Sequence, residues 1–170
     1  MDTFLNIASR REVRDFAGRP LPDDVVGRIL DAGRLAGSAK NRQPWTFVLV
    51  ESAERRARLA EAVYEPSNVR GAQLVVAIVL DAKGSPFDAG RAAQNMLLAA
   101  SNEGVGGVPN GAADRAAAYA ALGLAEDEQL PVILAFGYPA KERRPRESRP
   151  AAEWSARANR KPLTDLVRRV

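Results

Sequence analysis

The chain has 170 residues, of which 46% are hydrophobic and 27% charged, a net charge of +4, and neither cysteine nor histidine. This length and balance predict one compact globular domain, residues 1–170, with little room for a second core. The missing residue types exclude disulfides, thiolate metal sites and a Ser-His-Asp hydrolase, and they remove the commonest general base and transition-metal ligand. We therefore predict no metal site and expect any chemistry to come from a bound cofactor.

The first half of the chain reads as helices with one short strand. Asp23 and Asp24 follow Pro22 and suit the start of a helix that runs to about Ala36. The other expected elements are a helix over residues 3–11, a strand over 46–50 and a helix over 53–64.

The second half contains the two most apolar runs. Residues 74–80 and 132–138 are predicted core strands, the first covered on both faces. Helices are expected over 87–101, apolar nearly all round, and over 114–122, while the glycine-dense residues 104–111 read as a loop. This loop is not a dinucleotide fingerprint, because it follows a helix and its glycine spacing is wrong.

The C-terminal residues 140–170 are predicted to be an extended tail. Residues 141–159 are polar, basic and interrupted by proline, with Trp154 as the one large apolar side chain. Such a segment is too poor in apolar residues to build a core, so we expect it to be mobile or to lie over another surface, such as a second subunit.

Two groups of polar residues are candidates for ligand binding. Arg10, Arg11 and Arg14 have the spacing to gather on one side of a helix, where their guanidinium groups suit a phosphate monoester. A solvated basic face is the alternative. In the segment 38–45, Asn41 and Gln43 could pair with a planar heterocycle, and a polar turn capped by a buried Trp45 is the alternative.

Several blocks of the sequence resemble the FMN-dependent nitroreductases across nearly the whole chain. They are the opening RREVRDF (residues 10–16), ILDAGR with the later Ser38, Asn41 and QPW (29–45), DAG with AQNMLLAA (88–100), LGL (122–124), FGYP (136–139) and RKPL (160–163). The order and spacing of these blocks carry the resemblance.

The resemblance implies an α+β fold in which helices wrap a mixed, mainly antiparallel sheet, assembled as an intertwined homodimer with FMN in clefts that both subunits complete. Its implied cofactor contacts are Arg10, Arg11 and Arg14 at the phosphate and ribityl end, with Arg160 or Lys161 returning to the phosphate. Ser38 and Asn41 are implied to face the flavin from the other subunit, Gln43 is a further implied contact, and Asn68 and Arg70 are placed at the pyrimidine edge. Glu12 stands where the family usually has serine, and Gly37 where it has proline.

The implied activity is a transfer of hydride from NADH or NADPH to the flavin N5, followed by reduction of a small organic acceptor such as a nitroaromatic or a quinone. No side chain is assigned a catalytic acid–base role. Two other flavin activities of the same fold remain open, a dehalogenase and an azoline dehydrogenase, as does a family member that has lost FMN.

A basic binding module is the alternative outside flavin chemistry, but the scattered aromatic residues do not favour nucleic acid as the partner. The absence of a secretory signal and of an apolar run of about 20 residues predicts a cytoplasmic protein without membrane contact.

Overall fold

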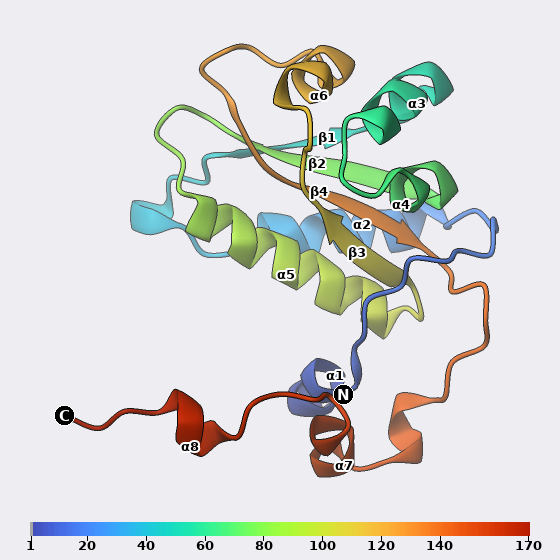
Figure 1. Ribbon diagram of the computed structural model, residues 1–170, viewed down its shortest axis with the longest axis vertical. Helices are drawn as coiled ribbons and strands as arrows, with labels where there is room; N and C mark the ends of the chain where they lie inside the picture. Colours follow the sequence, from blue (N-terminus) through green and yellow to red (C-terminus); the bar gives the residue numbers. More distant parts are fainter. Residues whose placement is uncertain (1) are drawn as a thin grey trace. The chain divides into compact units, whose positions relative to one another are not determined.

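A computed structural model describes residues 2–170, which form two compact units (Figure 1). The larger unit is Glu12–Glu142, and the smaller one joins residues 2–11 to Arg143–Val170. In the described chain, no helix is both long enough and apolar enough to cross a membrane.

The larger unit is built on a four-stranded sheet in the order β1-β2-β4-β3. The strands are β1 (Trp45–Leu49), β2 (Leu74–Leu80), β3 (Gly106–Asn110) and β4 (Gln129–Gly137). Every pairing between these described strands is antiparallel. The α+β prediction is confirmed, as are the two predicted core strands.

The helices of the larger unit are α2 (Asp23–Arg34), the 3₁₀ turn η1 (Ala39–Asn41), α3 (Ala53–Glu61), α4 (Pro66–Gly71), α5 (Pro86–Asn102) and α6 (Arg115–Leu122). Three of them begin just after a residue whose side chain caps the helix. The side chains of Ser52, Ser85 and Asp114 accept hydrogen bonds from the first turns of α3, α5 and α6. Gly123 ends α6 in the left-handed conformation, with φ of 70°.

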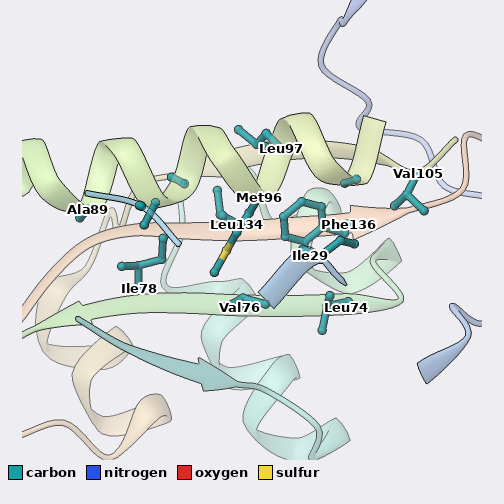
Figure 2. Close-up of a cluster of buried hydrophobic side chains, with 14 of the residues drawn as sticks. Ile29, Leu74, Val76, Ile78, Ala89, Met96, Leu97, Val105, Leu134 and Phe136 are labelled. Atoms are coloured by element: carbon teal, nitrogen blue, oxygen red, sulfur yellow. The ribbon is translucent and has the colours of Figure 1, made fainter. Parts of the chain in front are cut away.

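Two hydrophobic clusters cover the two faces of the sheet. On one face α2 and α5 pack against the sheet, and Figure 2 shows Ile29 and Met96 beside Val76, Leu134 and Phe136. The opposite face is covered by α3, α4 and α6 (Figure 1), which contribute residues such as Leu59, Val69 and Leu122. The helix over 87–101 is predicted to be apolar nearly all round, but α5 buries only one face in this chain and leaves Phe87, Arg91 and Gln94 exposed on the other, so that prediction is wrong.

All seven residues of β2 are buried, and they alternate between the two clusters. Backbone hydrogen bonds fix both ends of the strand. Gln73 N donates to Phe136 O (2.9 Å) just before β2, and Asp81 N donates to Pro44 O (3.1 Å) just after it.

The strand β3 corrects the predicted loop at residues 104–111. Glycine and proline have low strand propensity, which favours a loop in the sequence. In the structure, however, Gly106 and Gly107 pair with the end of β4. Because glycine has no Cβ, neighbouring side chains pack directly against this backbone. A Cβ on Gly106 would lie 2.4 Å from Val13, and one on Gly107 would lie 2.7 Å from Phe136. Pro109 is exposed on this edge strand, where a missing backbone donor is tolerated.

The smaller unit contains α1 (Thr3–Ser9), the 3₁₀ turn η2 (Arg146–Ser148), α7 (Ala151–Ala156) and α8 (Leu163–Leu166). Hydrogen bonds hold it together. Arg11 Nη1 donates to Ala8 O (2.7 Å) and its Nη2 to Trp154 O (3.0 Å). Trp154 Nε1 donates to Arg146 O (2.8 Å), and Arg146 Nη1 donates to Asn6 Oδ1 (3.0 Å). The tail thus packs on α1 through polar contacts that the sequence reading missed.

Candidate functional site

The ten residues predicted to bind a cofactor fall into three groups in the structure. Ser38, Asn41 and Gln43 lie in the loop before β1, and Arg14, Asn68 and Arg70 lie elsewhere in the larger unit. The remaining four, Arg10, Arg11, Arg160 and Lys161, belong to the smaller unit.

The loop before β1 has a constrained backbone. Lys40, Asn41 and Gln43 have φ values of 53°, 54° and 51°, a region that residues other than glycine seldom adopt. Ser38 Oγ accepts a hydrogen bond from Gln43 N (2.8 Å), and Gln43 Nε2 donates to Asn41 O (3.2 Å). These two bonds hold the three predicted residues of the loop close together. Strained backbone of this kind gathers at ligand sites.

A buried carboxylate anchors this loop to α5. Asp88 is 4% exposed, and its Oδ2 accepts a hydrogen bond from Ala39 N at 3.2 Å. Because α5 is fixed by the core beneath it, this bond ties the loop to a rigid element.

A cavity of about 440 Å³ lies beside the loop, between the end of α2 and the exposed face of α5. Gly37, Phe87, Arg91 and Asn95 are among the residues that line it. A Cβ on Gly37 would lie 2.3 Å from Arg91 Nη2, so glycine at this position lets the guanidinium approach the backbone. The cavity offers a cation, amides and a ring, the mixture found in small-molecule sites.

The segment with Arg14 lies beside the start of β3 and the end of β4. Val13 N donates to Gly107 O (3.4 Å), and Ala17 N donates to Tyr138 O (2.8 Å). Arg14 itself is exposed. Its side chain is therefore available to an anion at this end of the sheet.

Asn68 is buried in α4, where its amide meets a partner that the sequence analysis did not identify. Asn68 Nδ2 donates to Asn110 Oδ1 (2.7 Å), and the two residues are 3% and 7% exposed. Asn68 Oδ1 is buried and has no hydrogen-bond partner among residues 2–170. Arg70, two residues on, pairs instead with Glu61 on the surface.

The smaller unit concentrates positive charge. It has eleven Lys and Arg against four Asp and Glu, a net +7, whereas the larger unit has fourteen against seventeen, a net −3. Arg143 Nη1 donates to Arg11 O (3.2 Å). Partial burial lowers the pKa of Arg143, and the nearby charges of Arg11 and Arg10 lower it further. Three guanidinium groups that repel one another form an attractive place for an anion.

Arg143 was missed because it lies 132 residues after Arg11 and no spacing rule connects them. Arg160 and Lys161 are exposed in the segment just before α8. Arg11, which the sequence analysis assigned to phosphate, also has a structural part as the link between the ends of α1 and α7.

The two groups of predicted residues in the larger unit lie at opposite edges of the sheet. The loop with Ser38 leads into β1, whose Trp45 pairs with Leu80 at the end of β2. Asn68 precedes the start of β2 and contacts β3 on the other edge. Seven residues of β2 span roughly 20 Å, so these groups of one chain do not form one compact pocket.

Comparisons with known proteins identify the family. The sequence model described as the nitroreductase family matches residues 7–81 and 68–138. A protein of Archaeoglobus fulgidus is 31% identical over 148 residues, which cover 81% of this chain and 85% of that protein. Its name assigns it provisionally as an NADH dehydrogenase/NAD(P)H nitroreductase.

Two solved structures have the same fold. A protein of Desulfovibrio desulfuricans, crystallised in complex with FMN, is 28% identical with a TM-score of 0.83, and the match covers 98% of this chain and 95% of that one. The NADPH:FMN oxidoreductase of Vibrio harveyi, complexed with NAD⁺, is 27% identical with a TM-score of 0.77, and the match covers 84% of this chain and 72% of that one. From the family match over residues 7–138 and these likenesses, the chain belongs to the nitroreductase family.

Proposed function

We propose that this protein is an FMN-dependent oxidoreductase that works as a homodimer, taking hydride from NADH or NADPH and reducing a small organic acceptor such as a nitroaromatic or a quinone. The observation that carries the proposal is the cluster of Arg10, Arg11 and Arg143 in the positively charged smaller unit, where Arg143 Nη1 donates to Arg11 O at 3.2 Å. Burial lowers the pKa of Arg143, and repulsion by Arg11 and Arg10 lowers it further. A phosphate dianion among these side chains would relieve that repulsion.

The available donors and acceptors fit FMN at both of its ends. Guanidinium groups match the phosphate, as the sequence resemblance implies for Arg10, Arg11 and Arg14. The orphaned acceptor Asn68 Oδ1 matches a ring that carries an N–H group. FMN, when bound, supplies the redox-active ring, which agrees with the missing histidine and cysteine.

In this proposal the protein binds FMN and orients its ring. The arginines hold the anion, Asn68 fixes the edge of the ring, and the loop held by Asp88 presents Ser38 and Asn41. The relatives support the cofactor assignment, since one solved neighbour is an FMN complex and another is named as an NADPH:FMN oxidoreductase.

The placement of the predicted groups supports a dimer. Ser38 and Asn41 lie near one edge of the sheet and Asn68 contacts the other, roughly 20 Å apart along β2. A second copy can bring its loop to the Asn68 end of the first. We propose the tail, residues 140–170, as a further part of that interface, since Leu163 and Leu166 are 74% and 63% exposed.

The first test is direct. The purified protein, or the apoprotein given FMN, is expected to be yellow and to bleach with NADH or NADPH in the absence of oxygen. A protein that stays colourless after reconstitution contradicts the proposal. Comparing nitroaromatic and quinone acceptors by rate then defines the acceptor, and light scattering measures whether the active species is a dimer.

Single substitutions test the phosphate assignment. Arg10→Ala and Arg14→Ala are each expected to weaken FMN binding by about 10- to 100-fold, since a hydrogen bond to a charged group contributes roughly 1.5–3 kcal/mol. Arg34→Ala is the matched control, because Arg34 pairs with Asp31 on the surface of α2. Equal FMN affinity in all three variants would remove the two arginines from the site.

A further inference from the structure

The orientation of the Asn110 side chain is fixed by two backbone carbonyl groups. Asn110 Nδ2 donates to Val108 O (3.2 Å) and to Ile133 O (3.4 Å), so its two hydrogens are both used. Turning the amide over would place its oxygen against two carbonyl oxygens, which repel it. Asn110 must therefore present Oδ1, an acceptor, to its neighbour.

This acceptor in turn fixes Asn68. Its Nδ2 lies 2.7 Å from Asn110 Oδ1, and turning the Asn68 amide over would bring two oxygens to that distance. Asn68 Oδ1 is consequently the atom left over, buried and without a partner among residues 2–170. Leaving a buried acceptor unsatisfied is unfavourable, and such atoms in native proteins call for an explanation.

The surroundings allow a ligand to supply the missing donor. The helix α4 lies at the surface, with Ser67 and Arg70 exposed on either side of Asn68. Tyr64, 77% exposed, lies close to Gly111, the residue after Asn110. The buried acceptor of Asn68 is therefore flanked along the chain by exposed residues, so it lies near the protein surface.

We propose that Asn110 is a positioning residue that holds Asn68 with Oδ1 ready to accept from an N–H group of the bound ring. This inference rests on the proposed function, and for FMN it names N3–H, the one donor between the two carbonyl groups of the pyrimidine edge. The site then selects rings by the presence of that hydrogen. It disfavours a ring that offers only acceptors there.

The test compares FMN with N3-methyl-FMN, which lacks this hydrogen. The affinity of the apoprotein for each is measured by quenching of flavin fluorescence, which requires no turnover. The wild-type protein is expected to bind FMN at least about 10-fold more tightly than the methylated analogue.

Two substitutions of Asn110 separate positioning from general stability. Asn110→Leu removes the acceptor that orients Asn68, so the preference for FMN is expected to fall below about threefold. Asn110→Asp keeps an oxygen facing Asn68 Nδ2 and is expected to retain the preference, but it places its second oxygen against the carbonyl groups of Val108 and Ile133 and is therefore expected to be less stable than the wild type. Gln129→Leu is the control, since Gln129 Nε2 also binds backbone carbonyl groups, at the far end of β4.

Each outcome is decisive. A wild-type protein that binds neither flavin refutes the proposed function itself. If it binds FMN but accepts the methylated analogue equally well, the orphaned oxygen holds no more than water and the inference is wrong. If Asn110→Leu keeps the full preference for FMN while Asn68→Leu abolishes it, Asn68 recognises the N–H group without being positioned by Asn110, and the inference about Asn110 is wrong.

Discussion

Replacing Gly106 by alanine should force the N-terminal segment away from β3. The added Cβ would lie 2.4 Å from both Cβ and Cγ2 of Val13 and 2.8 Å from its Cγ1. Carbon atoms in contact normally lie about 3.5–4.0 Å apart, so Val13 must retreat by about 1 Å. A β-branched side chain cannot swing aside by a small rotation, so the backbone has to move and the bond from Val13 N to Gly107 O is lost.

The magnitude follows from two opposing effects. Overpacking of this kind costs about 1–3 kcal/mol, while replacing glycine within a strand recovers about 0.5–1 kcal/mol. We expect a net loss of about 1–2 kcal/mol, which lowers the melting temperature of a chain of this size by roughly 2–8 °C.

Thermal and urea denaturation followed by circular dichroism measure this loss. Gly27→Ala is the matched control, because Gly27 lies inside α2 with nothing within 4 Å of the added Cβ. It should raise stability by about 0.5–1 kcal/mol. A Gly106→Ala protein as stable as the wild type would show that Val13 does not pack on this strand as described.

Three further substitutions test other parts of the larger unit. Arg56→Lys should lower the free energy of unfolding by about 1–2 kcal/mol, because the Arg56 guanidinium bridges Ala72 O (2.7 Å) and Val50 O (3.1 Å) and an ammonium group cannot span both. Urea unfolding measures this loss, and an unchanged midpoint would contradict it. Ser52→Ala removes the cap of α3 and should cost about 1 kcal/mol, measured in the same way, whereas Ser52→Asp should restore it. Asp88→Ala should speed amide exchange in the loop before β1, and unaltered exchange there would show that the carboxylate is not its anchor.

The core strands were predictable because their signal is local. Residues 74–80 are apolar and rich in β-branched side chains, and no other element accommodates such a short run so well. The strand β3 was not predictable from its own residues, because pairing with β4 outweighs the poor strand propensity of Gly106, Gly107 and Pro109. The helix α4 is too short for periodicity to reveal it.

The candidate site divides in the same way. Residue types suited to phosphate and amide recognition, such as those of Arg14 and Asn41, are visible in the sequence. Their orientation is not, because it depends on contacts between distant positions. Asn68 acquires its partner 42 residues later in the chain, and Arg143 approaches the first arginines only after the tail has folded back.

The burial of β2 on both faces has a consequence for how the chain finds its pairing. In a sheet with one buried face, shifting the pairing register of a strand by one residue moves its apolar side chains to the solvent face, which is strongly unfavourable. Here such a shift exchanges Leu74, Val76 and Ile78 for Val75, Ala77 and Val79, and every one of these is apolar. Only differences in side-chain volume and the bonds at the two ends of the strand discriminate against the slipped arrangement. An enlarged side chain at Ala77 would narrow that difference, so misaligned species should accumulate during refolding.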